Sequence, residues 1–181
     1  MSTTDPSARS PSASSEARLF IALWPPDAVR DAVSRHAERW SWPLAATRVR
    51  PERLHMTLHF LGRVPRVRMA EMVEGLAVPL EPFELRLDHG ELWSGGIAVL
   101  AATEVAAQLV TLHGSLQRAL EGLGVPSVRS SLRPHVTLAR RARGAVPPAE
   151  CEQIVWAVDG YSLVESVLGP RSQYRVVAQW G

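Results

Sequence analysis

Two histidine–threonine pairs in this sequence have the residue types and spacing of an acid–base site. His55-x-Thr57-Leu recurs as His135-x-Thr137-Leu, 80 positions later (135 − 55), with an apolar residue between His and Thr in both copies. Two imidazoles in one cleft can act as general acid and general base, each typically contributing about 10² to 10⁴ in rate. Threonine hydroxyls can donate hydrogen bonds to oxygens that gain charge in a transition state. With flanking arginines to hold an anion, this set suits in-line transfer at a phosphodiester.

The residues around each pair alternate as in a β-strand. Side chains two positions apart point to the same face of a strand, so His and Thr share one face in each copy. The apolar neighbours are expected to point into a core; they are Met56, Leu58, Phe60, Val136 and Leu138. We therefore expect two equivalent strands that carry two imidazoles and two hydroxyls into one cleft.

Further strands and helices are needed to position these two strands. Apolar residues at helical spacing predict helices over 26–40, 66–77 and 109–123. Apolar runs and alternation predict strands over 18–24, 83–89, 97–102, 161–168 and 174–180, with a hairpin turn at Ser94-Gly95-Gly96. A helix and an arginine-bearing loop precede each motif strand. This order predicts an α+β chain of two similar lobes that face each other, although it also fits a single-sheet sandwich.

The composition limits the classes of chemistry. The chain has 181 residues, of which 46% are hydrophobic, enough for one domain or two small lobes with a sizeable core. Its 20 basic residues are all arginine, which excludes a phosphate-loop lysine, Schiff-base chemistry and a lysyl-adenylate. Arginine favours planar, bidentate contact with phosphate or carboxylate. An anionic ligand is therefore compatible with the small net charge of +2.

The N-terminal segment and the single cysteine indicate the setting of the protein. Residues 1–16 are rich in Ser, Pro, Thr and Ala, so we expect a disordered tail before a single domain over 17–181. The tail lacks the apolar centre of a signal peptide, and no later run is long enough to cross a bilayer, so we expect a cytoplasmic protein. Cys151 excludes an internal disulfide, and we interpret it as incidental rather than nucleophilic.

Four segments of the chain resemble one known family. They are RLFIALWPP (18–26), LHMTLHFLG (54–62), RPHVTLAR (133–140) and LVESVLGP (163–170), followed by Tyr174. These segments resemble the 2H phosphoesterase superfamily, and more narrowly its RNA 2′,3′-cyclic phosphodiesterase group, also called the 2′-5′ RNA ligase family. The resemblance implies a bilobal fold with antiparallel sheets inside, helices outside and the active-site cleft between the lobes. It also implies hydrolysis of a cyclic phosphate to a 2′-phosphate without metal or cofactor.

The resemblance assigns roles to five residues. His55 and His135 would be the catalytic acid–base pair, and Thr57 and Thr137 would donate to phosphate oxygens. Arg140 matches an arginine that contacts the phosphate, although strict alternation places it opposite His135. A strand end, a β-bulge or the long guanidinium arm could resolve this conflict. The suggested assignment has His135 activate water and His55 protonate the departing O3′. The partner would be RNA or a nucleotide ending in a 2′,3′-cyclic phosphate, with no membrane, no obligate protein partner and a monomeric chain.

Three alternatives to this hydrolytic role stay open at this point. The first is a zinc site made of His55, His59 and His135, although positions i and i+4 of a strand lie about 13 Å apart. The second is a protein that binds nucleotide or RNA in the same cleft without turnover. The third is synthesis of 2′-5′ linkages by the reverse attack at the same phosphate.

The other histidines and aromatic residues have weaker functional signals. Alternation places His59 at the cleft face, but we expect a solvent-facing residue at the strand end. We interpret three other histidines as surface residues: His36, His89 and His113. Glu165 and Ser166 fit either strand packing or ligand contact. Trp24 and Trp93 could stack on a base, but packing in the core or between the lobes is the default for such residues.

Overall fold

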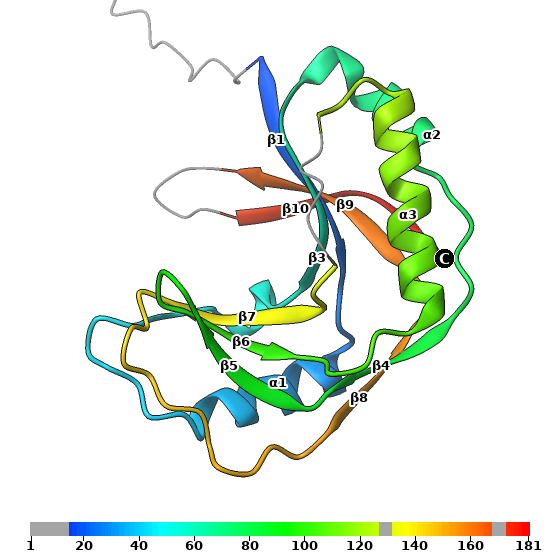
Figure 1. Ribbon diagram of the computed structural model, residues 1–181. Helices are drawn as coiled ribbons and strands as arrows, with labels where there is room; N and C mark the ends of the chain where they lie inside the picture. The colour runs from blue at the N-terminus through cyan, green and yellow to red at the C-terminus, as the bar shows by residue number, and fades with distance from the viewer. Residues whose placement is uncertain (1–14, 127–131, 168–172) are drawn as a thin grey trace, which may run out of the picture.

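The structure, a computed structural model, describes residues 15–126, 132–167 and 173–181 (Figure 1). The predicted tail lies outside the described residues except for its last two positions, and Glu16 already belongs to the first strand. In chain order the elements are β1 (Glu16–Leu23), α1 (Asp27–Glu38), β2 (Thr47–Arg48), the 3-10 helix η1 (Pro51–Arg53), β3 (Met56–Pro65), the 3-10 helix η2 (Arg66–Arg68), α2 (Met69–Gly75), β4 (Phe83–Leu87), β5 (His89–Trp93), β6 (Ile97–Ala101), α3 (Ala107–Gly122), β7 (His135–Arg140), β8 (Ile154–Val158), β9 (Tyr161–Val167) and β10 (Gln173–Trp180).

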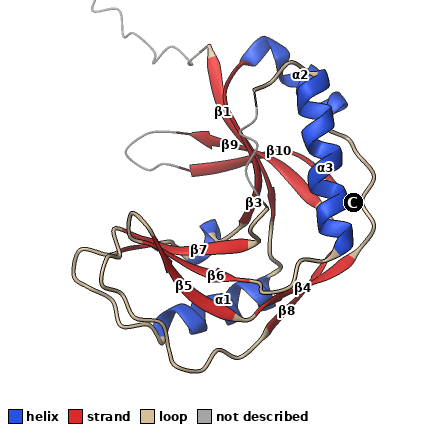
Figure 2. Ribbon diagram, viewed as in Figure 1, coloured by secondary structure: helices blue, strands red, loops and turns tan. Residues whose placement is uncertain are grey.

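Two antiparallel sheets of four strands form the two lobes. The first sheet has the order β10-β9-β1-β3, and the second has the order β2-β7-β6-β5. Figure 2 shows α2 and α3 beside the first sheet and α1 beside the second, so the helices lie on the outer sides. The two motif strands, β3 and β7, belong to different sheets and come close to each other. The predicted arrangement of two α+β lobes is therefore confirmed.

Apolar periodicity accounts for the packing of the helices. In α3, four leucines at helical spacing are buried against the first lobe: Leu109, Leu112, Leu116 and Leu120. The hydrophobic core runs through both lobes, since buried residues of β1, β3, β6 and β7 belong to one cluster. Burial of apolar area on this scale is the main force that holds the two sheets in place. Among the described residues, no helix has the length and apolar character needed to cross a membrane.

The hairpin prediction is confirmed, but its first strand begins later than expected. Ser94-Gly95-Gly96 joins β5 to β6, and both glycines have positive φ values, of 80° and 74°, which suit glycine in a tight turn. The strand predicted over 83–89 is confirmed over Phe83–Leu87, and a separate strand, β5, begins at His89, because the chain changes sheets at Asp88. Its carboxylate accepts hydrogen bonds from the backbone and hydroxyl of Thr103 and from the His89 ring, and so fixes the bend.

A strand that the sequence reading missed completes the fold. β8 alternates buried Ile154, Trp156 and Val158 with exposed Val155 and Ala157, and it pairs with β4 in a separate two-stranded sheet. This short sheet connects the two lobes in the chain. It follows a proline-rich loop, which masks the strand signal in the sequence.

Candidate active site

The motif strands meet at a cleft between the two sheets. The cleft has a volume of about 530 Å³, and its lining includes His55, Thr57, Thr137 and Arg140. His135 does not line this cleft but stands on the same strand as Thr137, close enough for its charge to act on His55. The structure therefore gathers all five residues predicted for the site in one region.

Both motif strands contain a β-bulge at the same position. In β3, Thr57 pairs with Ala22 and His59 with the adjacent Ile21, so Leu58 has no partner on β1. In β7, Thr137 pairs with Val99 and Ala139 with the adjacent Ala98, so Leu138 has no partner on β6. A bulge inserts one residue into a strand and reverses the faces of the residues that follow. Each copy of the motif therefore changes its alternation immediately after Thr.

The bulge in β7 explains how Arg140 reaches the cleft. Leu138 and Ala139 are both buried, which breaks the alternation, and Arg140 then returns to the face of His135. Of the three explanations considered from the sequence, the structure shows the bulge, and Arg140 is also the last residue of the strand. The backbone carbonyl of Leu138 accepts a hydrogen bond from the Val49 amide at 2.7 Å, so the bulged residue is not left unsatisfied.

The bulge in β3 overturns the sequence interpretation of Phe60 and His59. Phe60 was expected in the core, but 47% of it is exposed, and it lines the cleft under the Arg18 guanidinium. His59 was expected to face solvent, but it is 4% exposed. Phe60 follows His55 by five positions, as Arg140 follows His135, so the two residues occupy equivalent places in the two copies.

His59 forms a buried pair with His113 of α3. The two rings stack with centroids 4.1 Å apart, and His59 Nε2 donates a hydrogen bond to the His113 carbonyl at 3.0 Å. His113 in turn donates to the backbone of Leu58, the bulged residue. His113 was expected at the surface, but it is half-buried in this pair. Because His59 points away from His55 and into the core, the zinc arrangement of His55, His59 and His135 is not formed.

Acid should weaken the fold through this histidine pair. Burial, with the neighbouring His113 charge, lowers the pKa of His59 from 6.5 to about 4. As the pH falls, the unfolded chain therefore binds a proton at His59 at a higher pH than the folded chain does. The stability that is present above pH 6.5 is lost as the pH falls towards 4. We expect this group to cost about 2 kcal/mol of unfolding free energy between pH 7 and pH 4.5. Urea unfolding of the wild type and of His59→Gln at these two pH values measures the loss.

The His59→Gln variant keeps a donor for the His113 carbonyl but has no proton to gain in this range. Its unfolding free energy should therefore change less with pH than that of the wild type. Thr111→Val on α3, the helix that carries His113, removes no titratable group and is the control that should keep the wild-type slope. Equal slopes for His59→Gln and the wild type would contradict the buried-pair explanation.

His55 and His135 are anchored in the same way. His55 Nδ1 donates to the Arg53 carbonyl at 2.7 Å, and His135 Nδ1 donates to the Arg133 carbonyl at 2.6 Å. In both cases the acceptor is the backbone two residues earlier. A carbonyl can only accept, so Nδ1 carries the hydrogen in each ring and Nε2 is left to exchange a proton with a ligand.

Aromatic side chains hold both imidazoles in place. The Trp24 ring stacks on His55 at 5.4 Å with an interplanar angle of 7°, and Phe20 and Tyr174 pack on other sides of the same ring. Trp93 packs on His135 with ring centroids 4.4 Å apart. Both tryptophans therefore pack against the candidate site itself.

The electrostatic setting of the two imidazoles is also similar. Burial lowers the pKa of His55 and of His135 from the ordinary value of 6.5, and nearby arginine charges lower both further. The backbone hydrogen bonds act in the opposite direction. Burial and the arginine charges therefore favour the neutral form of both rings.

Several arginines around the cleft were not singled out as site residues from the sequence. Arg18, Arg48, Arg50 and Arg53 line it together with Arg140. The Arg53 guanidinium lies 4.4 Å over the Tyr174 ring. No carboxylate is among the lining residues within the part of the chain that the structure describes. This distribution favours an anionic ligand, and the arginine-rich loop before β3 was the signal that could have located it.

Glu165 and Ser166 have separate roles. Ser166 lines the cleft, whereas Glu165 is buried on the other side of the sheet between Arg66 and Arg175. Burial alone would raise the pKa of Glu165, but hydrogen bonds from the two arginines outweigh it and lower the pKa. Glu165 is therefore a strand-packing residue, which was one of the two interpretations of the sequence.

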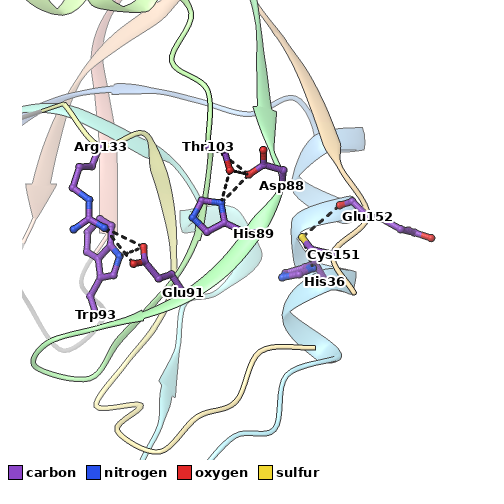
Figure 3. Close-up of polar contacts among 9 residues, drawn as sticks. All are labelled: His36, Asp88, His89, Glu91, Trp93, Thr103, Arg133, Cys151 and Glu152. Carbon is purple, nitrogen blue, oxygen red and sulfur yellow. Dashed lines mark hydrogen bonds and ion pairs between the residues drawn. The ribbon is translucent and has the colours of Figure 1, made fainter. Parts of the chain in front are cut away.

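Cys151 and His36 form a small cluster away from the cleft (Figure 3). His36 was expected at the surface but is buried, and its Nε2 accepts a hydrogen bond from Trp40 Nε1 at 3.1 Å. The hydrogen of neutral His36 is therefore on Nδ1, which faces the Cys151 sulfur at 3.7 Å. Burial, followed by the charge of Asp88, raises the pKa of the Cys151 thiol. This pair lacks a base for the thiol proton. Within the described ranges, no group of three or more His, Cys, Asp or Glu side chains could hold a metal ion.

Comparison with known proteins places the chain in a family. The family model of the 2′-5′ RNA ligase superfamily matches residues 25–169. The chain belongs to this superfamily. An RNA 2′,3′-cyclic phosphodiesterase of Thermus thermophilus is 31% identical over 176 residues, which cover 90% of this chain and 88% of the relative. The superfamily expected from the sequence is therefore confirmed, and the chain is an enzyme of the cyclic phosphodiesterase class.

Two solved structures of one protein have the same fold as this chain. The crystal structure of E. coli LigT in its apo form matches with a TM-score of 0.83 and 25% identity, covering 92% of this chain and 98% of LigT. The crystal structure of LigT complexed with 3′-AMP matches with a TM-score of 0.81 and 25% identity, covering 91% of this chain and 97% of LigT. These matches confirm the bilobal 2H phosphoesterase-like fold.

Proposed function

We propose that this chain hydrolyses a terminal RNA 2′,3′-cyclic phosphate to a 2′-phosphate by metal-independent acid–base catalysis. The observation that carries the proposal is the matched anchoring of His55 and His135, which leaves two Nε2 atoms available beside one arginine-lined cleft. The name of the Thermus relative supports the RNA substrate. The 3′-AMP bound to LigT supports a nucleotide ligand for this fold.

The hydrolytic step uses the two histidines in opposite directions. His135 Nε2 takes a proton from water while the water oxygen forms a bond to phosphorus. The bond from phosphorus to O3′ breaks, and protonated His55 gives its Nε2 proton to that oxygen. The product has a 2′-phosphate and a free 3′-hydroxyl. The two rings then exchange one proton with solvent to restore the starting state.

Thr57, Thr137 and Arg140 are suited to hold the non-bridging phosphate oxygens. All three line the cleft, and within the described residues neither threonine hydroxyl has a hydrogen-bond partner. Their donors are therefore available to oxygens that gain charge during attack. The Arg140 guanidinium adds a planar donor group with a fixed positive charge.

The lowered pKa values of His55 and His135 fit these two roles. A neutral His135 can accept a proton from water at physiological pH. His55 must be protonated before it can donate, and the negative charge of a bound phosphate favours its imidazolium form. Substrate binding therefore favours the protonated form of His55, whereas burial and the neighbouring arginine charges favour the neutral form of His135.

The decisive experiment uses an RNA oligonucleotide that ends in a 2′,3′-cyclic phosphate. Purified protein is incubated with it in the presence of a chelator, and the 2′-phosphate and 3′-phosphate products are separated. We expect only the 2′-phosphate, at a rate that the chelator does not change. A 3′-phosphate product would reverse the leaving group and overturn the mechanism. Tight binding without any product would show a nucleotide-binding protein that uses the same cleft.

The same geometry permits 2′-5′ ligation, which the name of the superfamily includes. A 5′-hydroxyl then replaces water as the nucleophile, and the bond to O3′ breaks as before. Since water is in large excess, we expect hydrolysis to dominate. An acceptor oligonucleotide with a free 5′-hydroxyl, added to the same assay, reports the ratio of linked to hydrolysed product.

A further inference from the structure

A carboxylate close to His135 has no part in the steps described above. Glu91 of β5 accepts a hydrogen bond from Trp93 Nε1, with 2.5 Å between that nitrogen and Glu91 Oε2. It also accepts from Arg133 Nη2, at 3.1 Å to Oε2 and 3.4 Å to Oε1. Figure 3 shows the three side chains joined through this one carboxylate.

Both partners of Glu91 contact His135. The Trp93 ring packs on the imidazole with centroids 4.4 Å apart. The Arg133 guanidinium lies over the Trp93 ring, 4.2 Å from its centroid. The Arg133 carbonyl accepts the hydrogen bond from His135 Nδ1. One side chain and one backbone carbonyl thus fix the ring, and Glu91 holds the residues that supply them.

We propose that Glu91 is a positioning residue for His135, because it fixes Trp93 against the imidazole and neutralises Arg133 beside it. The contribution of Glu91 to turnover rests on the proposed function. Its effect on the position and titration of the His135 ring does not, and this effect can be measured separately. The two parts of the proposal can therefore fail independently.

The contribution of Glu91 to fold stability is a weak alternative explanation. Its ion pair with Arg133 is partly exposed at both ends, with side-chain exposures of 40% and 56%. Exposed pairs of this kind contribute little to stability because water already solvates both charges. The value of the network lies in what it positions.

The two copies of the motif differ in this feature. The charges that act on His55 come from Arg53, His135 and Arg140. Among the described residues, no carboxylate charge acts on this ring. The charges that act on His135 come from Arg133, Arg140 and Glu91, and the charge of His135 acts in turn on His55. Burial lowers the pKa of His135 most, the nearby arginine charges lower it further, and the Glu91 carboxylate acts in the opposite direction. Glu91 therefore breaks the electrostatic symmetry between two otherwise similar imidazoles.

Two substitutions separate the positioning of Trp93 from the charge. Glu91→Gln keeps an oxygen that can accept from Trp93 but leaves Arg133 without its neutralising carboxylate. Glu91→Ala removes both. We expect the His135 ring to titrate at lower pH in Glu91→Gln than in the wild type. We expect Glu91→Ala to lower kcat by about tenfold with little change in KM, since a displaced base loses its alignment.

The experiment combines NMR titration of the histidine rings with pH profiles of kcat/KM. If His135 is the base, the acidic limb of the profile should move to lower pH in Glu91→Gln. Movement of the alkaline limb instead would keep Glu91 as a positioning residue but make His135 the acid. Glu84→Gln, which removes an exposed carboxylate paired with Arg86 outside the cleft, is the matched control and should change neither readout.

Two results would overturn the proposal: an unchanged His135 titration in Glu91→Gln, or wild-type kcat in Glu91→Ala. A shifted titration in a protein that hydrolyses no cyclic phosphate would refute the proposed function instead, and would leave the hold of Glu91 on His135 standing. Recovery of kcat in Glu91→Gln relative to Glu91→Ala would assign most of the effect to the Trp93 contact.

Discussion

Substituting alanine for His55 or His135 is expected to lower kcat for cyclic phosphate hydrolysis by about 10² to 10⁴-fold. Each change removes one proton-transfer group, whereas the threonines and arginines of the cleft stay in place. KM should change much less, because the phosphate keeps its donors. Steady-state assays on the cyclic-phosphate oligonucleotide measure both constants.

Glu84→Gln, which changes an exposed side chain outside the cleft, is the control for these variants and should leave kcat unchanged. His55 is packed among Phe20, Trp24 and Tyr174, so His55→Gln accompanies His55→Ala and keeps most of the ring volume. Thermal unfolding shows that each variant is folded. If either alanine variant kept a tenth of the wild-type kcat, the two-histidine mechanism would be wrong.

The double variant provides a second check on the same mechanism. Acid and base act in one step on opposite sides of the phosphorus atom, so losing the second group after the first should cost less than losing it alone. A strictly multiplicative loss would indicate that the two histidines contribute independently to the transition state. The matched backbone anchors of the two rings favour a single step in which both Nε2 atoms take part.

The sequence was sufficient to predict the elements with strong local patterns. The leucine series of α3, the glycine turn between β5 and β6, and the two motif strands all follow from residue spacing within one element. Up to Thr57 and Thr137, alternation also gives the correct face of each side chain. These features could be predicted because residues close in the sequence determine them.

The faces of the residues beyond Leu58 and Leu138 could not be predicted. The bulges at Leu58 and Leu138 depend on groups that can hydrogen-bond the backbone of the extra residue. In both bulges this group comes from a distant part of the chain. Leu138 bonds the Val49 amide, and Leu58 bonds the His113 side chain. Neither partner is near its bulge in sequence, so His59 and Phe60 were assigned to the wrong faces.

The surroundings of the imidazoles were also beyond the sequence pattern. Trp93 and Glu91 come from β5, which is separated from β7 by β6 in the sheet. Trp24 and Tyr174 reach His55 from the end of β1 and from β10. Motif spacing identifies the groups that react, but tertiary packing selects the groups that hold them.

The second large effect is expected from the threonine hydroxyls. Replacing Thr57 or Thr137 with valine should lower kcat by about 10² to 10³-fold, the usual cost of one donor to a charged transition-state oxygen. Valine keeps the shape of threonine but cannot donate. Because the donor matters most when the phosphate oxygens gain charge, KM should rise less than kcat falls. The same oligonucleotide assay gives both values.

Serine tests whether the hydroxyl itself is responsible. Thr57→Ser and Thr137→Ser keep the donor and should recover most of the activity that valine removes. Thr111→Val on α3 is the control, because its hydroxyl bonds the Ala107 carbonyl away from the cleft and its loss should not change kcat. Equal activity of the serine and valine variants would show that these positions only fill space. In that case Arg140 would be left as the main donor to the phosphate among the five predicted residues.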